Sequence, residues 1–136
     1  MCSRSIINLM NLLQKIPTEW PLRLGAGIMY LYSGYDLIVN PRHWYGFVPQ
    51  WFSRAVTSVA SLDTYLFIQG AGEFIIGLLL LSWFLGERTL QVASSLMFVE
   101  MGLILLFVGV DPITFRDIGL LGAAGALMCL AWKKKD

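Results

Sequence analysis

The chain has 136 residues, of which 57% are hydrophobic and only 14% are charged, and its mean hydropathy is +0.65. A soluble domain of this length could not bury so many apolar side chains, so the composition excludes an ordinary globular protein and predicts a single membrane-embedded domain. A net charge of +1 also excludes the broad basic surface of a nucleic-acid-binding protein. The two cysteines, Cys2 and Cys129, form no redox motif.

The first predicted element is a short helix on the membrane surface. Residues 5–16 bring a set of apolar side chains to one helical face: Ile6, Leu9, Met10, Leu13 and Ile16. Polar residues occupy the other faces, and Pro17 ends the pattern. This pattern is typical of an amphipathic interfacial helix and, without a small-residue cleavage site, not of a signal peptide. We therefore expect residues 1–17 to form an interfacial segment and residues 18–136 the transmembrane domain.

Four windows follow that are long and apolar enough to cross a bilayer, which takes roughly 20 residues. They cover residues 19–39, 63–84, 89–109 and 114–132. Polar or helix-breaking residues separate them, and the tryptophans lie at their ends or between them, as is typical of the membrane interface. The sequence therefore predicts an all-α membrane protein with a bundle of four transmembrane helices.

The connection between the first two windows, residues 41–60, is rich in aromatic residues and contains Trp44, Tyr45 and Trp51. Two interpretations fit it equally well: an outer interfacial segment that caps the mouth of the bundle, and a plain loop with aromatic anchors. His43, the only histidine, is interpreted as a loop residue, and we expect no metal site.

The basic residues predict the orientation in the membrane. Four spans place both termini on one side, and that side carries most of the positive charge: Arg4, Lys15, Arg88, Lys133, Lys134 and Lys135. By the positive-inside rule, both termini are expected in the cytoplasm, with the chain integral to a cell membrane of the prokaryotic inner-membrane type.

Small residues predict which helix faces are buried. Glycines recur seven residues apart in three windows, as the pairs Gly27 and Gly34, Gly70 and Gly77, and Gly102 and Gly109. Such stripes let helices approach closely, so they predict packing seams. By helical spacing, Arg23, Glu73 and Arg116 also lie on small-residue stripes and are expected to point towards other helices. Glu100 lies opposite Gly102, and the pattern does not decide its burial.

The same placement predicts a polar pocket in the outer half of the membrane. It would be built from Asp36, Glu73, Arg116 and Asp117, with Tyr32 one turn below Asp36 and Arg23 nearer the inner surface. From the helical rise, Glu73 lies roughly 12 Å below the outer interface and Arg116 about 4 Å below it, so a long arginine side chain can reach the carboxylate. Two interpretations remain open: a functional site, and ion pairs that only fix the helix register.

Three stretches resemble the DoxX family of small four-helix membrane proteins: LRLGAGIMYLYSGYDLIVNP (22–41), GAGEFIIGLLLL (70–81) and FRDIGLLGAAGAL (115–127). The shared features are an arginine and glycines opening the first helix, a glutamate among glycines in the second, and an Arg-Asp pair starting the fourth. The resemblance covers nearly all of residues 18–132. It implies that the family's polar set is Arg23, Glu73, Arg116 and Asp117. Many members carry a lysine where Asp36 and Leu37 stand here.

The resemblance implies several roles. Some members form the membrane subunit of a thiosulfate:quinone oxidoreductase, others belong to oxidoreductase complexes with soluble partners, and distant members act as membrane chaperones or cargo receptors. We therefore expect a protein that binds a quinone or another lipid-like molecule in the polar pocket, with no cofactor in the chain itself and with an oxidoreductase subunit or further copies as partners. The alternatives are a small proton-coupled transporter built around Glu73 and a scaffold that packs against other membrane proteins.

Overall fold

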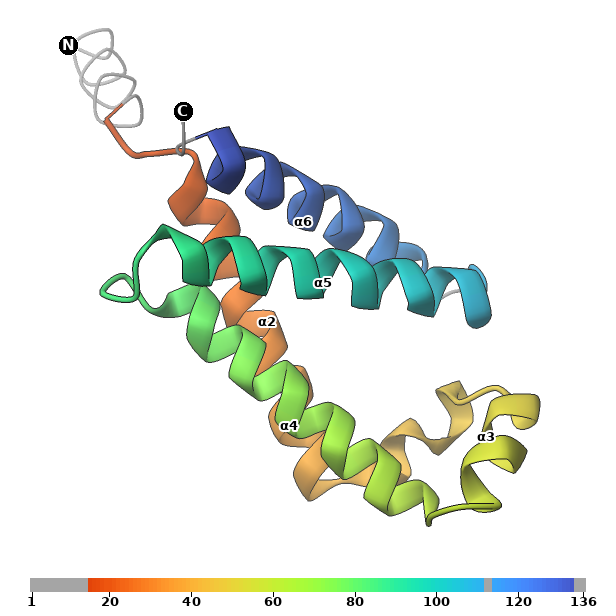
Figure 1. Cartoon of the computed structure of the whole chain (residues 1–136). Helices are drawn as coiled ribbons and strands as arrows, with labels where there is room; N and C mark the ends of the chain where they lie inside the picture. Colours follow the sequence, from red (N-terminus) through yellow and green to blue (C-terminus); the bar gives the residue numbers. More distant parts are fainter. Residues whose placement is uncertain (1–14, 112–113, 134–136) are drawn as a thin grey trace, which may run out of the picture.

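The computed structural model describes residues 15–111 and 114–133, so the interfacial helix expected at residues 5–16 lies almost entirely outside the described residues. Within them the chain is all helical, without a strand. The long helices are α2 (Glu19–Val39), α4 (Leu62–Leu81), α5 (Glu87–Phe107) and α6 (Phe115–Lys133). Between α2 and α4 lie the 3-10 helix η1 (Pro41–Phe47) and the short helix α3 (Gln50–Thr57) (Figure 1). Each predicted window therefore folds as one long helix.

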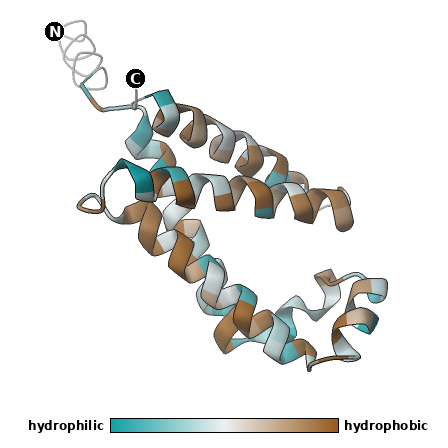
Figure 2. Cartoon of the chain, in the orientation of Figure 1, coloured by the Kyte–Doolittle hydropathy of each residue, from teal (hydrophilic) through white to brown (hydrophobic). Residues whose placement is uncertain are grey.

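Three of these helices, α4, α5 and α6, are long and apolar enough to cross a membrane. Helix α2 is equally long, with 21 residues, but Arg23, Asp36 and its tyrosines lower its hydropathy. Large apolar side chains face outward, and Leu106 for example is 74% exposed. Figure 2 shows apolar residues along α4 and α5 and polar residues gathered where α5 begins and α6 ends. An apolar exterior of this kind fits contact with lipid.

Helices α2 and α4 pack backbone to backbone along the predicted glycine seam. A methyl group added at Gly34 would lie 2.6 Å from both the Gly70 carbonyl oxygen and the Phe74 amide nitrogen. One added at Gly77 would lie 2.9 Å from the Leu31 amide nitrogen and 3.0 Å from the Gly27 carbonyl oxygen. No larger side chain fits at these distances, so the seam predicted for this helix pair is confirmed.

The seam predicted for the third window is wrong. A methyl group at Gly102 would meet only the Leu121 side chain, at 3.9 Å. Gly109 lies beyond the end of α5 and has a φ of +83°, a left-handed conformation that glycine adopts readily. Gly109 therefore serves the turn between α5 and α6, and its spacing from Gly102 does not mark a contact between helices.

The buried face of α6 also differs from the predicted one. Arg116, Gly119 and Ala126 are exposed, whereas Ala124, Leu127 and Ala131 are fully buried. The buried stripe packs with Ala93, Met97 and Met101 of α5 in the core of the molecule. Both stripes of α6 contain small residues, so small-residue spacing alone did not identify the one that α5 covers.

The long helices form two pairs, α2 with α4 and α5 with α6, which meet at one end and diverge towards the other (Figure 1). At the meeting end, Gln91 Nε2 donates a hydrogen bond to the Ala131 carbonyl oxygen at 2.9 Å, which ties α5 to α6. At the far end, the rings of Trp51 in α3 and Phe107 in α5 have centroids 5.8 Å apart. The aromatic segment after α2 therefore reaches across from one helix pair to the other.

The start of α4 is held by a cap and by η1. The Ser61 hydroxyl accepts a hydrogen bond from the Thr64 amide at 3.1 Å, which satisfies one free donor of the first turn. The Tyr45 hydroxyl donates to Asp63 Oδ1 at 2.6 Å, and this hydrogen bond raises the pKa of Tyr45. The predicted cap or loop of residues 41–60 is thus a helical segment attached to the beginning of α4.

Candidate functional site

Three acidic side chains from three long helices face one another inside the molecule. Glu73 of α4 is only 5% exposed, because it lies on the buried face that also carries the seam glycines. It interacts electrostatically with Glu100 of α5 and Asp117 of α6. Gln69 Nε2 donates a long hydrogen bond to Glu73 Oε1 at 3.4 Å, and Ser33 of α2 interacts with the same carboxyl group. We call Glu73, Glu100 and Asp117 the carboxyl cluster.

A buried tyrosine of α2 faces the carboxyl cluster. Tyr30 is 0% exposed, and its side chain interacts most strongly with Glu100, then with Glu73 and Asp117. Neither the Tyr30 hydroxyl nor Glu100 Oε2 has a hydrogen-bond partner with acceptable geometry in the described part of the chain. A buried polar atom without a partner costs about 1–3 kcal/mol. The Tyr30 hydroxyl and the Glu100 carboxyl group interact with each other, but neither of these two atoms has a well-aligned hydrogen bond in the described part of the chain.

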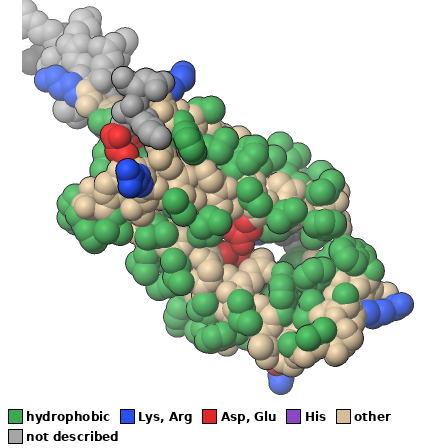
Figure 3. All heavy atoms as spheres, in the orientation of Figure 1, with side chains coloured by type: hydrophobic (Ala, Val, Ile, Leu, Met, Phe, Trp, Pro, Cys, Tyr) green, Lys and Arg blue, Asp and Glu red, His purple; other side chains and the backbone are tan. Residues whose placement is uncertain are grey.

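Acidic side chains lie beside a hollow between the two helix pairs (Figure 3). Figure 3 shows acidic side chains gathered in the middle of this face, where a hollow opens between the upper and lower helix pairs. Near the start of α4, Phe52 of α3 packs on Tyr65 of α4 with ring centroids 5.1 Å apart. Tyr65 in turn interacts with Glu100 and Glu73. The hollow thus combines an acidic region with apolar surroundings (Figure 3), a combination that suits an amphipathic molecule.

The predicted pair of Glu73 and Arg116 is not formed. Between residues 15 and 133, leaving out 112 and 113, the ion pairs join Arg23 to Glu19 and His43 to Asp36. Arg116 is exposed and acts on the cluster only through its neighbour Asp117. Consecutive residues of a helix point about 100° apart, so when Asp117 turns towards the other helices Arg116 turns away from them.

Asp36 and Tyr32 lie apart from the carboxyl cluster. The Asp36 carboxylate accepts hydrogen bonds from Asn40 Nδ2 at 2.8 Å and from Trp44 Nε1 at 2.9 Å, and His43 Nδ1 lies 3.7 Å from it. Tyr32 is 74% exposed and faces outward. Asp36 therefore attaches η1 to the end of α2, and the structure brings only Glu73 and Asp117 of the predicted pocket together.

Arg23 is buried as predicted, but it belongs to the opposite end of α2. Its Nε and Nη2 donate hydrogen bonds to the carbonyl oxygens of Leu80 and Ser82, both at 2.7 Å. Its Nη1 donates to Glu19 Oε1 at 2.8 Å. The last carbonyl groups of a helix have no partner within the helix, so Arg23 supplies donors where α4 ends.

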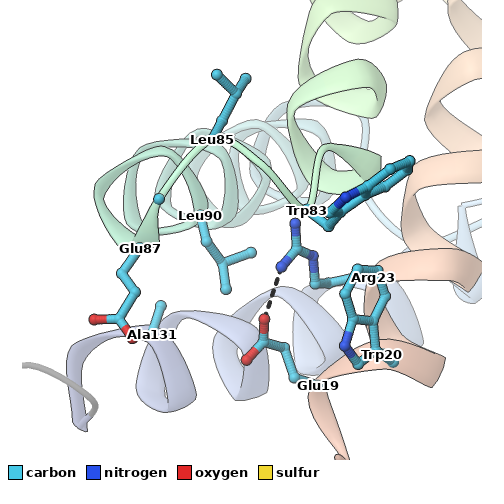
Figure 4. A pocket seen from close by; sticks show the side chains of 9 residues that line it. Glu19, Trp20, Arg23, Trp83, Leu85, Glu87, Leu90 and Ala131 are labelled. Carbon is cyan, nitrogen blue, oxygen red and sulfur yellow. Dashed lines mark hydrogen bonds and ion pairs between the residues drawn. The ribbon is translucent and has the colours of Figure 1, made fainter.

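A small pocket of about 220 Å³ lies beside Arg23, between α2, α5, α6 and the connection from α4 to α5. Figure 4 shows the Arg23 guanidinium between the rings of Trp20 and Trp83, with its ion pair to Glu19 below. The guanidinium carbon is 4.7 Å from the Trp20 ring centroid, which is a cation–π contact. Because the guanidinium is already bonded on three nitrogens, we interpret this pocket as part of the structural junction.

Sequence reasoning missed Tyr30 and Glu100 as parts of the site. Tyr30 lies on the same helical face as Arg23, Gly27 and Gly34, so its burial followed from the pattern. The sequence does not show, however, whether the hydroxyl of a buried tyrosine has a hydrogen-bond partner. Glu100 is an acid within an apolar helix long enough to cross a membrane, and for that reason alone was a candidate. Its direction depends on how α5 packs, which the sequence left open.

The exposure of Arg116 leads to a prediction about stability. Arg116→Leu should change the free energy of unfolding by less than about 0.5 kcal/mol, because the side chain is exposed and pairs with no buried carboxylate. Thermal unfolding in a mild detergent measures this, with Arg54→Leu in the exposed part of α3 as the matched control. A loss of several kcal/mol for Arg116→Leu alone would show that the pair with Glu73 exists after all.

The described residues contain no group of three histidine, cysteine, aspartate or glutamate side chains placed to hold a metal ion. No family model, no curated protein and no solved structure matches the chain. The case for a function therefore depends on the carboxyl cluster, Tyr30 and the hollow.

Proposed function

We propose that the chain is a DoxX-like integral membrane protein with four spans that binds a quinone or another lipid-like molecule in the hollow, as part of a membrane oxidoreductase system. The observation that carries this proposal is the carboxyl cluster beside the hollow, facing the unpartnered hydroxyl of the fully buried Tyr30. Intramembrane acidic residues are costly to bury and mark ligand, ion or proton sites more often than surface acids do.

Helix α2 is the fourth span in this proposal. Its 21 residues measure about 30 Å at the helical rise, which equals the thickness of the hydrocarbon layer. Its close contact with α4 through Gly34 and Gly70 would keep both helices at the same depth. Its charged side chains are shielded, since Glu19 and Arg23 are buried and Asp36 bonds to Asn40 and Trp44.

The chemistry of the cluster suits a neutral ligand with carbonyl groups. A protonated carboxyl group and a tyrosine hydroxyl are both hydrogen-bond donors, and a quinone carbonyl accepts such bonds. No basic side chain interacts with Glu73 or Glu100 in the described part of the chain, so the cluster offers no positive charge to an anionic head group. The tail of a lipid-like ligand would lie along the apolar walls of the hollow.

The role of the chain in a redox reaction would be to bind and orient the quinone and to supply protons. Reduction of a quinone to a quinol takes up two electrons and two protons. Electrons would come from a partner subunit, and the carboxyl groups of Glu73, Glu100 and Asp117 would serve as proton donors beside the reduced carbonyl oxygens.

The scaffold alternative loses its main argument. It relied on glycine stripes that were free to pack against other membrane proteins, but the glycines of α2 and α4 are used within the chain, where Gly34 contacts Gly70 and Gly27 contacts Gly77. Gly102 and Gly109 do not form a stripe for close packing. The seam glycines of α2 and α4 are therefore already occupied and do not form a docking face for a further membrane protein.

Quinone binding should be measurable as stabilisation of the purified protein. We expect quinone among the lipids extracted from protein purified in mild detergent, and an added short-chain quinone should raise the melting temperature. A ligand at one hundred times its Kd stabilises the folded state by about 2.7 kcal/mol. Tyr30→Phe removes a hydroxyl that faces Glu100 and Glu73 and should show a smaller rise with quinone than the wild type.

Glu73→Gln should likewise show a smaller rise, whereas the exposed Glu87→Gln at the start of α5 serves as the control with an unchanged rise. The proposal fails if neither quinone nor lipid co-purifies and quinone does not shift the wild-type melting curve. An equal shift in wild type, Tyr30→Phe and Glu73→Gln would mean that quinone binds elsewhere.

A further inference from the structure

We infer that the carboxyl cluster also binds a lipophilic organic cation, which enters the hollow in exchange for a proton. This inference rests on the proposed placement of the hollow inside the membrane but not on the binding of quinone. It concerns the deprotonated state of the same acidic groups, in which they accept positive charge rather than donate hydrogen bonds.

The cluster has an excess of negative charge over positive charge. The groups that interact with its members come from every helix around it: Tyr30 and Ser33 of α2, Gln69 and Tyr65 of α4, and Asp111 and Arg116 on either side of the turn before α6. Arg116 is the one basic group among them, and it is exposed and acts only on Asp117. Glu73 and Glu100 therefore lack a positively charged partner in the described part of the chain.

A second observation points into the same place. Tyr30 is 0% exposed, and its unpartnered hydroxyl faces Glu100 and Glu73. A hydroxyl in this position donates to a carboxylate when the acid is ionised and accepts from a carboxylic acid when it is not. It can therefore support the cluster in both states, which an exchange of proton for cation requires.

The exchange follows from the cost of charge in the membrane. Neighbouring carboxylates repel each other, and an isolated charge in the hydrocarbon layer costs several kcal/mol, so the cluster needs protons or a cation. When a monovalent cation binds, one carboxylic acid releases its proton to the solvent and the resulting carboxylate balances the cation. No bond other than this O–H bond breaks, and no electrons are transferred.

The hollow favours a large organic cation over a metal ion. The described residues contain no group of three side chains placed to hold a metal ion. The separate acidic groups therefore suit a cation whose positive charge is spread over a larger volume. The ring of Tyr65 lies near Glu100 and Glu73 and packs on Phe52, and aromatic faces attract cations. Apolar substituents on the cation would contact the same walls that suit a lipid tail.

Tetraphenylphosphonium is a suitable probe for the full chain in mild detergent and weak buffer. Calorimetry should show saturable binding, and a pH indicator should show release of about one proton for each cation bound, so that affinity rises with pH. Glu73→Gln should weaken binding at least about tenfold, which corresponds to 1.4 kcal/mol. Glu87→Gln, an exposed acid outside the cluster, should bind the probe as the wild type does.

Binding without proton release, or equal binding by wild type and Glu73→Gln, would overturn this inference. A melting shift with quinone but no response to tetraphenylphosphonium would leave the proposed function in place and refute the cation exchange. Exchange of cation for proton without any effect of quinone on melting would support the cation exchange and refute the proposed function. The two proposals can therefore fail separately.

Discussion

Gly34→Val is expected to lower the stability of the protein by about 3 kcal/mol or more. The added Cβ would lie 2.6 Å from the Gly70 carbonyl oxygen and the Phe74 amide nitrogen. These are backbone atoms of α4, so no side-chain rotation can relieve the contact. Inserting extra carbon atoms into a packed interior typically costs about 1–3 kcal/mol, and this site falls at or beyond the upper end because α2 and α4 must separate.

The control for Gly34→Val is Gly25→Val on the same helix. Gly25 is exposed, and a methyl group there would meet nothing within 4 Å. Both variants exchange glycine for the same branched residue within α2, so they share the change in helix propensity and differ in the contact with α4. Thermal unfolding of both proteins in one detergent gives the comparison. Equal melting temperatures would show that α2 and α4 do not meet at Gly34.

The positions of the long helices could be predicted because long apolar stretches with polar ends are a strong signal in the sequence. A span must be apolar over roughly 20 residues and must end at polar or helix-breaking residues. The four windows agree with the ends of α2, α4, α5 and α6 to within three residues, the largest difference being residue 84 against Leu81. Helical structure in the connection after α2 could not be predicted, because residues 41–57 are held by contacts such as Trp51 on Phe107 that lie far apart in sequence.

The buried faces were only partly predictable. Glycine spacing identified the contact of α2 with α4, since glycines on both helices allow an approach that no other residue permits. In α6 the exposed stripe through Gly119 and the buried stripe through Ala124 are both small. Which of them packs depends on the shape of α5, where Met97 occupies the interface. That information is not contained in the periodicity of α6 itself.

The candidate site was also only partly predictable from the sequence. Glu73 could be found from its position in the middle of an apolar stretch, and its burial is confirmed. The neighbours of Glu73 could not be predicted, because a pairing with Arg116 and a pairing with Glu100 require different rotations of α5 and α6. Helical rise fixes the depth of a residue but not its direction, so a depth argument favoured an arginine that faces away from the cluster.

Arg23→Leu is expected to cost about 3–5 kcal/mol, as does the removal of one partner from other buried ion pairs. The substitution takes the guanidinium away from Glu19, a carboxylate that is only 7% exposed. It also removes the donors that the carbonyl oxygens of Leu80 and Ser82 receive at 2.7 Å. The end of α4 and the start of α2 would lose their connection, and we expect a lower melting temperature in detergent.

Companion variants separate the charge from the hydrogen bonds. Arg23→Lys keeps the charge but cannot reach Glu19, Leu80 and Ser82 together from one ammonium group, so it should lie between wild type and Arg23→Leu. Adding Glu19→Gln to Arg23→Leu should recover part of the loss, because the buried carboxylate is gone. Arg88→Leu, at the exposed start of α5, is the control. If Arg23→Leu melts no lower than Arg88→Leu, the junction between the start of α2 and the end of α4 does not depend on Arg23.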